Sequence, residues 1–466
     1  MSPGHLFGIE TEYGFLVHHR DDPFASERIV HQVRDYLFKE RKIGLIDLHH
    51  RAHDEPPGNG GFLLNGGRLY IDMGHIEYAT PECTRLSEIV SYDRAGDILL
   101  QQTLEEMGLA GEAGFIKNNV DYETGATFGS HENYLVSRAF PFTLEGLGQL
   151  IPFLVTRQIF AGAGRIGANF VPDGFILVGE ADFPNIPFQI SQRSDHIVSD
   201  FYQWVQFNRA IINTRDEPLA DPERYRRIHL LLGDSNLSEY AAALKVGTTA
   251  LVLDLIQEGM APDLSIQDPV LALKSISRDP SRRWEVRLEN GRPSTAVEIQ
   301  GRYLEAAQKY LAGRDEDSDW TLQAWGETLN DLNGDIENLV GRIDWASKLW
   351  LLESFMKAEK RDWEDPWLKS LDIEYHHTNP ERGLYFGLEN ENRAVRRTTP
   401  DCIRQALEMP PSETRAVGRA WLTRRLLEDP APYIIHWSSF YIKEKNMRMT
   451  DPFHTYLKEV KAFLGG

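Results

Sequence analysis

The segment Arg68-Leu69-Tyr70-Ile71-Asp72 decides how we interpret this chain. Its polar and apolar residues alternate, which predicts a β-strand with Arg68, Tyr70 and Asp72 on one face. A solvated sheet face would show the same alternation, so the pattern alone does not identify a site. The arrangement recurs in three further segments, however, and this recurrence favours a functional site built on one face of a sheet.

The first of these segments covers residues 6–16, where Glu10 and Glu12 share a face of the predicted strand. Two carboxylates held this closely repel each other unless a cation lies between them. Mg²⁺ suits such a position because it prefers oxygen ligands. A solvated acidic strand is the alternative interpretation of this segment.

The other two segments carry imidazoles beside polar partners. Residues 128–135 place His131 and Asn133 on one strand face, and a later strand does the same with Arg227 and His229. Several arginines surround this later strand in a chain that is otherwise acidic, which predicts an anion site. Ion pairing with neighbouring acidic residues is the alternative.

The surrounding sequence predicts a sheet followed by helices. Asn65-Gly66-Gly67 is a tight-turn signal between strands at 62–64 and 68–72, which predicts a hairpin. Beyond residue 236 the pattern becomes mainly helical. The predicted helices lie at about 26–41, 86–107, 238–258, 269–276, 296–311 and 347–359, and further strands are expected near 175–178, 188–192 and 211–214.

Composition limits the possible functions. The 466 residues carry 50 basic and 70 acidic side chains, a formal charge of -20, which argues against a nucleic-acid-binding surface. Only two cysteines are present, Cys83 and Cys402, and they suit a reducing compartment. No apolar run approaches the roughly 18 residues of a membrane span. We therefore expect a cytoplasmic protein that binds neither nucleic acid nor membrane.

The collected strand faces predict the chemistry of the site. Oxygen ligands together with arginines favour Mg²⁺-nucleotide chemistry, and Asp72 remains available as a base or nucleophile. No phosphate-loop, kinase or dinucleotide-binding motif is present. The candidate metal ligands are Glu10, Glu12, Tyr70, Glu77, His131 and His229, and the candidate phosphate partners are Arg68, Arg193, Arg215 and Arg227.

These segments together resemble the Pup ligase and depupylase family, which acts on the prokaryotic ubiquitin-like protein Pup. The resemblance covers nearly the whole chain. It rests on Gly8-Ile9-Glu10-Thr11-Glu12-Tyr13-Gly14, residues 65–72, Lys117-Asn118-Asn119, Gly129-Ser130-His131-Glu132-Asn133-Tyr134 and residues 211–236. It implies an α+β fold, a glutamine-synthetase-like curved antiparallel sheet backed by helices. It also implies a catalytic domain at 1–397 and a small C-terminal domain at 398–466.

The resemblance also implies roles for individual residues. Asp72 matches the essential aspartate, and Arg193 matches an arginine near the bound phosphate. The implied cofactors are ATP, or ADP plus phosphate, and Mg²⁺, and the implied partners are a Pup-like modifier and its conjugates. The implied Mg²⁺ ligands are Glu10, Tyr70, Glu77, His131 and His229, and the implied nucleotide contacts are Arg68, Thr80, Asn133, Arg227 and Trp437.

The family has two activities, and several stretches resemble its depupylase branch. These are residues 129–131, 191–195 and 245–256, and the spacing of five residues from Asp72 to Glu77. We therefore expect a nucleotide-dependent depupylase and deamidase, which hydrolyses the side-chain amide or isopeptide bond at the C-terminal Glu or Gln of the modifier.

The first alternative is a Pup-protein ligase, which forms that isopeptide bond to a substrate lysine and consumes ATP. The short loop at 47–61 and the motif Asp451-Pro452-Phe453 favour it, whereas the length of the 166–187 segment fits neither branch well. A non-catalytic modifier-binding homologue and a ligase joining glutamate to a small amine are further alternatives.

Overall fold

The structure is a computed structural model that describes residues 4–18, 22, 24–51, 55–122, 124–167, 186–203 and 209–465. The strand predicted near 175–178 and most of the 166–187 segment lie outside these residues. Among the described residues, no helix combines the length and apolar character that a membrane crossing would need.

A large sheet forms the centre of the described fold, and ten strands belong to it. All neighbouring pairs are antiparallel except β10 and β11, which run parallel. The order across the sheet is β10 (Ser199–Tyr202), β11 (Ala210–Asn213), β12 (Tyr225–Leu230), β7 (Ser130–Ser137), β1 (Phe7–Val17), β5 (His75–Ala79), β4 (Arg68–Asp72), β3 (Gly60–Leu63) and β2 (Gly44–Ile46), and β6 (Ala113–Ile116) pairs with β1. The predicted α+β class is confirmed.

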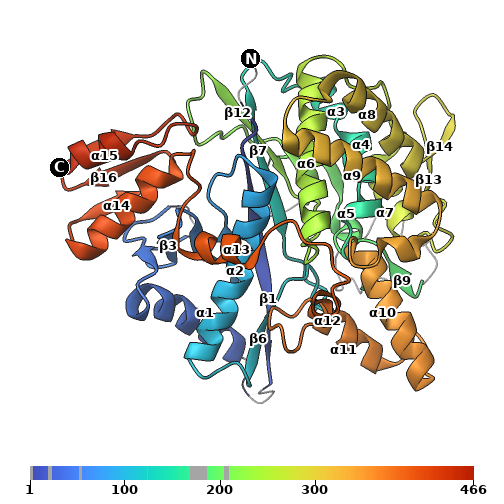
Figure 1. Cartoon of the computed structure of the whole chain (residues 1–466), viewed down its shortest axis with the longest axis horizontal. Coiled ribbons are helices and arrows are strands. Elements are labelled where there is room, and N and C mark those ends of the chain that lie inside the picture. Colours follow the sequence, from blue (N-terminus) through green and yellow to red (C-terminus); the bar gives the residue numbers. More distant parts are fainter. Residues whose placement is uncertain are drawn as a thin grey trace.

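Helices cover one face of this sheet, and most of them follow it in the chain (Figure 1). They are α1 (Ala25–Asp35), α2 (Leu86–Glu106), α3 (Leu144–Gly148), α4 (Ile151–Thr156), α5 (Gln158–Ala161), α6 (Glu239–Gln257), α7 (Pro269–Ser277), α8 (Ala296–Leu311), α9 (Glu316–Asn333), α10 (Asp344–Glu359), α11 (Pro366–Tyr375) and α12 (Leu384–Asn390). Two small hairpins accompany them, β8 (Arg165–Ile166) with β9 (Phe188–Gln189), and β13 (Glu285–Arg287) with β14 (Pro293–Thr295).

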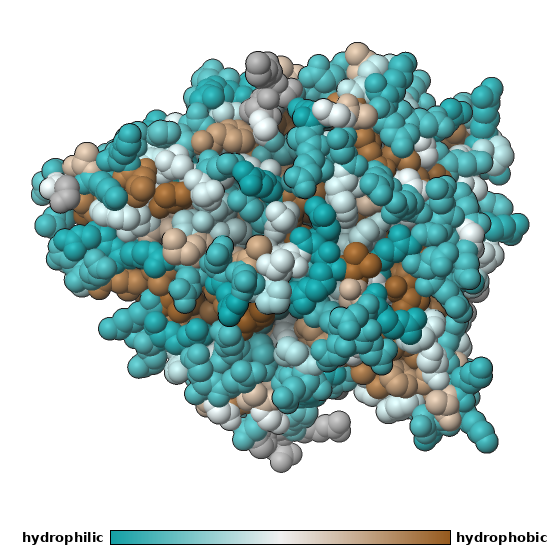
Figure 2. Space-filling model, viewed as in Figure 1, coloured by the Kyte–Doolittle hydropathy of each residue, from teal (hydrophilic) through white to brown (hydrophobic). Residues whose placement is uncertain are grey.

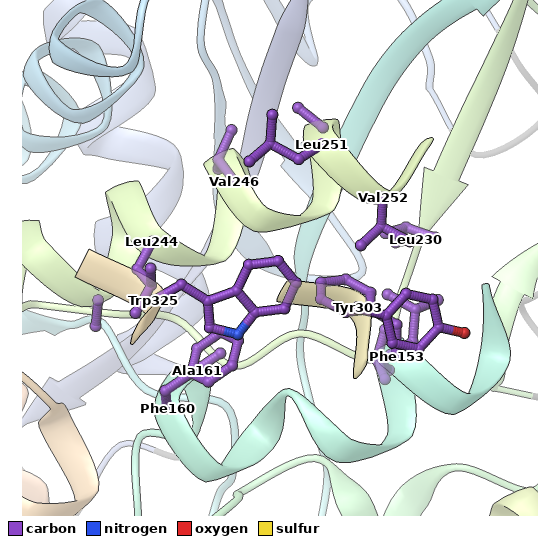
Figure 3. Packing of buried hydrophobic residues seen from close by; sticks show 14 of the residues in the cluster. Phe153, Phe160, Ala161, Leu230, Leu244, Val246, Leu251, Val252, Tyr303 and Trp325 are labelled. Carbon is purple, nitrogen blue, oxygen red and sulfur yellow. The ribbon is translucent and has the colours of Figure 1, made fainter. Parts of the chain in front are cut away.

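The core lies between the sheet and these helices. Figure 3 shows Trp325 of α9 and Tyr303 of α8 packed beside Phe153 of α4. The ring contacts join α4, α8 and α9, and helix α6 supplies Leu244 and Leu251 to the same cluster. Burial of one sheet face in this way leaves the other face available for a site.

Two tight turns determine which residues reach that open face. In the first, the Asn65 side chain accepts a hydrogen bond from the Gly67 amide at 2.9 Å, and Gly66 has a φ of +83°, so the predicted hairpin is confirmed as β3–β4. In the second, Met73 and Gly74 both have positive φ and reverse the chain within two residues. This turn places Asp72 opposite His75 on β5.

The C-terminal segment forms a small unit beside the main sheet, at the left in Figure 1. Helix α14 (Ala416–Glu428), strands β15 (Tyr433–Ile435), β16 (Ser439–Ile442) and β17 (Lys445–Arg448), and helix α15 (Leu457–Phe463) have their own core, which also contains Leu45 and Phe62 of the main sheet. Helix α13 (Pro400–Glu408) instead packs in the main core through Ile403 and Ala406. The domain boundary at 397/398 stays a prediction.

An ion cluster joins this unit to the main sheet. Glu82, which follows β5, accepts hydrogen bonds from Arg415 at 2.7 Å and from Arg419. Burial alone would raise the pKa of Glu82, but the two guanidinium groups lower it to about 2. The carboxylate is therefore ionised, and its two counter-ions both belong to the C-terminal unit.

Sequence patterns located most helices but missed one long one. The predicted helices at 86–107, 238–258 and 296–311 are confirmed as α2, α6 and α8. Helix α9 was not predicted, because its first turn is acidic and its buried face mixes the apolar Leu322, Trp325 and Leu329 with buried Ser and Thr side chains. Helix α1 begins at Ala25, one residue before the predicted start at 26, and its first residue is not preceded by a capping side chain.

Most of the molecular face shown in Figure 2 is hydrophilic, with smaller hydrophobic patches between the helices and along the C-terminal unit.

Candidate active site

Strand register brings the predicted metal ligands together on the open sheet face. Glu10 of β1 lies opposite His131 of β7, and Glu12 lies opposite Glu77 of β5. Glu77 in turn lies opposite Tyr70 of β4. Directly opposed side chains of antiparallel strands share a face, so residues far apart in sequence converge here.

The first of two ligand groups combines one carboxylate with two imidazoles. The nearest ring nitrogens lie 3.5 Å (His131) and 3.8 Å (His229) from a Glu10 carboxylate oxygen. One ligand atom from each residue lies within 4.8 Å of the others, as a shared cation would require. The Nε2 of His229 is buried and has no hydrogen-bond partner among the residues that the structure describes, which suits a metal ligand.

The carboxylate of this group is ionised. Burial alone would raise the pKa of Glu10, but the hydrogen bond from His131 and electrostatic interactions with His229 and Arg227 lower it to about 2. Burial and the nearby Arg227 lower the pKa of His229 well below its ordinary value, which leaves a neutral imidazole. We call Glu10, His131 and His229 the mixed group.

The second group contains three carboxylates: Glu12, Asp72 and Glu77. Their nearest oxygens also lie within 4.8 Å of one another. Burial, followed by repulsion from Glu10 and Glu12, raises the pKa of Glu77 well above its ordinary value. We call this set the carboxylate group. The structure thus places Asp72, which was predicted as a base or nucleophile, among the candidate metal ligands.

Tyr70 and Gly129 complete the surroundings of the carboxylate group. The Tyr70 hydroxyl donates to Glu77 at 2.5 Å, and the Gly129 amide donates to Glu12 at 2.7 Å. Burial and the adjacent carboxylates raise the pKa of Tyr70, so its hydroxyl keeps its proton. In this arrangement Tyr70 orients Glu77, and its predicted role as a direct metal ligand stays a prediction.

The reverse face of β1 is held by a buried polar network. Thr11 donates to Asp93 of α2 at 3.1 Å, and Tyr13 donates to Asp97 one helical turn later at 2.7 Å. Lys117 bridges both carboxylates at 2.6 and 3.2 Å. Because these contacts fix the register and orientation of β1, they also fix Glu10 and Glu12 on its other face.

A pocket beside the mixed group contains four of the five predicted nucleotide contacts. Thr80, Asn133, Arg227 and Trp437 all line it. Arg227 donates to the Asn133 side chain at 3.2 Å, and Arg419 lies 4.7 Å from the centre of the Trp437 ring. The C-terminal unit therefore closes one side of a pocket whose other walls come from the sheet.

The fifth predicted contact, Arg68, does not line that pocket. Its guanidinium pairs with Asp47 at 3.0 Å and with Glu55 at 2.5 Å, and it lies 4.2 Å from the centre of the Tyr70 ring. These partners come from the loop after β2, whose charges the sequence analysis did not pair with Arg68. Nucleotide contact by Arg68 stays a prediction.

Arg193 lies on a loop that is held by a single carboxylate. Asp234 accepts hydrogen bonds from the backbone amides of Ala163, Gln192 and Arg193 at 2.8–3.0 Å, and from the Ser191 hydroxyl at 3.1 Å. Sequence reasoning missed Asp234. No pattern marked it, because it follows the apolar segment 230–232 and its partners are backbone groups.

A larger cavity, of about 770 Å³, lies away from this site. It opens between the first turns of α2 and α9, where Arg85, Asp317 and Arg397 line it. None of the predicted site residues belongs to its lining. Size alone therefore does not identify the reactive centre, whereas the converging ligands do.

The fold and the site define an α+β class of protein in which acidic and imidazole side chains project from the open face of a mainly antiparallel sheet beside a pocket. A family model described as Pup-ligase protein matches residues 5–441. The chain belongs to the Pup-ligase family.

Individual relatives include both branches of the family. The chain is 37% identical over 474 residues to a Pup-protein ligase of Acidimicrobium ferrooxidans, and the match covers 98% of each chain. It is 38% identical over 447 residues to a depupylase of Acidothermus cellulolyticus, covering 89% of this chain and 86% of the depupylase.

Two solved structures of the ligase PafA are similar over nearly the whole chain. A complex of Pup with PafA has a TM-score of 0.84 at 32% identity and covers 98% of this chain and 90% of PafA. PafA in complex with ADP has a TM-score of 0.77 at 32% identity and covers 97% of this chain and 95% of PafA.

Proposed function

We propose that this protein is an ATP-dependent ligase that joins a carboxylate of a Pup-like modifier to a lysine of an acceptor protein. The observation that carries the proposal is the end-to-end match to Pup-protein ligases. Those of Acidimicrobium and Nocardioides are matched over 98–99% of both chains, whereas the depupylase match leaves 14% of that protein uncovered. The short loop at 47–61 supports the same choice.

The open sheet face suits the cofactors that this reaction needs. PafA has been solved with ADP, and the pocket lined by Thr80, Asn133, Arg227 and Trp437 is our candidate for the nucleotide. The mixed and carboxylate groups offer the oxygen and imidazole donors that would hold Mg²⁺. Bound Mg²⁺ would neutralise charge on the phosphoryl group that is transferred.

Asp72 has the position expected of a base. It lies at the end of β4, beside a two-residue turn, so its carboxylate is at the edge of the sheet face where an acceptor side chain can approach. In the ligase reaction ATP would phosphorylate the modifier carboxylate, and Asp72 would accept a proton from the incoming lysine ammonium. The resulting amine would attack the acyl phosphate, forming the isopeptide bond as the bond to phosphate breaks and phosphate leaves.

The proposal is tested by incubating the purified chain with Mg²⁺-ATP, glutamate-ended Pup and an acceptor protein, with an Asp72→Asn lane beside it. The ligase predicts acceptor bands of higher mass that require ATP and are absent for Asp72→Asn. If the wild-type chain instead cleaves a preformed Pup conjugate, and consumes little ATP while doing so, the ligase assignment is wrong.

That outcome would establish the second candidate, a depupylase and deamidase acting at the C-terminal Glu or Gln of the modifier. The five-residue spacing from Asp72 to Glu77 and the 38% identity to a depupylase favour it. Here Asp72 would attack the isopeptide carbon or activate water. A non-catalytic modifier-binding protein is less well supported, because both ligand groups are assembled. A cytoplasmic location remains part of this proposal.

A further inference from the structure

The turn that follows Asp72 combines two unfavourable features in one residue. Met73 has a φ of +47°, in the left-handed region that residues with a Cβ adopt only at an energetic cost. It is also 82% exposed, more than any other large hydrophobic residue in the part of the chain that the structure describes. Strained residues of this kind cluster at functional sites, so the turn is a candidate for a role in the reaction.

Other hairpins of the chain show what a turn contains when only the backbone has to be satisfied. Asn65-Gly66 connects β3 with β4, and Asn290-Gly291 connects β13 with β14. Asn-Gly is the pair that tight turns favour. The β16–β17 turn has Lys443 at a φ of +54° and is similarly strained, but a lysine side chain is well solvated when it is exposed. Among these four turns, only the one with Met73 holds an exposed apolar side chain in the left-handed region.

The strands on both sides hold this turn in place. His75 pairs with Asp72 across the turn, and its ring stacks on Phe128 with the ring centroids 4.6 Å apart. The Nδ1 of His75 donates to a backbone carbonyl of β1 at 3.0 Å. A Cβ added at Gly74 would have no atom of the described residues within 4 Å, so the turn faces open space. Met73 is therefore an exposed apolar residue on a well-supported turn.

We propose that Met73 contacts the acceptor protein and helps to determine which of its lysines reach Asp72. This inference rests on the proposed function. Consecutive Cα atoms lie about 3.8 Å apart, so a group that reaches Asp72 passes close to Met73. The stem of a lysine has only four carbons, so the protein surface that carries it must also come near the turn. Methionine is unbranched and polarizable and adapts to irregular apolar surfaces, so lysines flanked by apolar residues should be preferred.

The test compares Met73→Asn, which suits the turn but removes the apolar contact, with Met73→Leu, which keeps an apolar side chain. KM is measured for an acceptor protein in the conjugation assay. In a second assay hydroxylamine replaces the acceptor and attacks the acyl phosphate, which yields a hydroxamate and free phosphate. Met260→Asn is a matched control, because Met260 is an exposed methionine just after α6.

Met73→Asn should raise KM for the acceptor protein by about five- to tenfold, as expected if about half of one methionine side chain becomes buried in the complex. The rate of hydroxamate formation should not change, since hydroxylamine is too small to reach the turn while it reacts. Met73→Leu should stay within about twofold of the wild type. Thermal melting should show no loss of stability in Met73→Asn, and Met260→Asn should match the wild type in both assays.

The outcomes separate this inference from the proposed function. An unchanged KM in Met73→Asn, in a chain that does form conjugates, would overturn the inference and leave the ligase proposal standing. Equal losses in the two assays would also overturn it, because Met73 would then act through Asp72.

If the chain instead hydrolyses conjugates, the ligase proposal fails and the inference is still decided. The protein part of the conjugate then occupies the acceptor position, so Met73→Asn should raise KM for the conjugate and not for deamidation of a glutamine-ended modifier. Equal changes in these two KM values would overturn the inference. A wild-type chain that is inactive in every one of these assays would overturn both.

Discussion

The mixed group and the carboxylate group lie on the same sheet face, yet their charges are arranged differently. In the mixed group, two imidazoles stand beside Glu10 and hold its pKa at about 2. In the carboxylate group, Glu77 lies beside Glu12 and Asp72, and its pKa is raised. The first group is stable without a cation, whereas the second is relieved only by a cation or a proton. We infer that cation binding stabilises the carboxylate group more than it stabilises the mixed group.

Replacement of Asp72 by Asn should have the largest effect on the reaction. The amide cannot accept the proton that the reaction releases, so turnover should fall by about 10²- to 10⁴-fold. Single-turnover conjugation assays measure this loss. Nucleotide affinity should remain largely intact, because Asp72 does not line the pocket. A loss of nucleotide affinity in Asp72→Asn would show that the carboxylate group also takes part in nucleotide binding.

Replacement of Glu10 by Ala should act on binding. It removes the one carboxylate of the mixed group and leaves two imidazoles, so affinity for Mg²⁺-ATP should fall by more than the roughly 10- to 100-fold that loss of an outer-shell partner costs. Titration calorimetry with Mg²⁺-ATP checks this. Glu145→Ala, on α3, is a suitable control because Glu145 belongs to neither group. If Glu10→Ala binds Mg²⁺-ATP as tightly as the wild type does, the mixed group is not a metal site.

The contrast in pKa predicts opposite effects of pH on the metal-free protein. Glu77 binds its proton more tightly in the folded chain, so its contribution to the free energy of unfolding is full below pH 4.5 and declines as the pH rises above that value. Glu10 contributes stability above pH 4.5 that is lost as the pH falls toward about 2.

Urea unfolding of the metal-free protein between pH 5 and 8 tests this contrast. The free energy of unfolding of Glu77→Gln should depend less on pH than that of the wild type. Mg²⁺ should restore stability to the wild type at the upper end of the pH range. Parallel pH profiles for the two proteins would show that Glu77 keeps an ordinary pKa, and that the carboxylate group carries less repulsion than its geometry implies.

Replacement of Asp234 by Asn should have the smallest effect of these substitutions. One amide oxygen replaces two carboxylate oxygens that accept four hydrogen bonds, so the loop carrying Arg193 should lose about 1–3 kcal/mol of support. We expect kcat to fall severalfold, and to fall no further when Arg193→Gln is added. Additive losses in the double variant would assign Asp234 a purely structural role. Asp365→Asn, at the N-terminus of α11, is a matched control because Asp365 also accepts a hydrogen bond from a backbone amide.

The strand faces were predictable from the sequence because a two-residue period depends only on local pattern. Alternation placed Tyr70 and Asp72 together before any pairing was known. The alternation did not predict which strands are neighbours in the sheet. For example, β1 pairs with β5, whose residues come more than sixty positions later. The collected strand faces supplied the candidate ligands, and the family resemblance supplied the individual roles in binding metal and nucleotide.

Contacts made by single side chains could not be predicted. Asp234 binds backbone amides that any sequence would offer, and Arg68 was expected to meet a nucleotide but pairs with Glu55. The sequence motifs also did not decide between the ligase and depupylase branches. The local motifs around Arg193 favoured hydrolysis, whereas the extent of the ligase matches favours ligation. Short motifs identify the chemistry that both branches of the family share more reliably than they show whether the isopeptide bond is formed or hydrolysed.

The ion cluster between Glu82 and the C-terminal unit has a consequence for the design of shortened versions of this protein. Removal of residues 415–466 would take away both counter-ions of Glu82, uncover Leu45 and Phe62, and delete Trp437 from the pocket. A truncated chain that no longer binds nucleotide would therefore look like an active-site mutant although every ligand on the sheet is intact. The C-terminal unit is a wall of the active site, and tags should be attached beyond it.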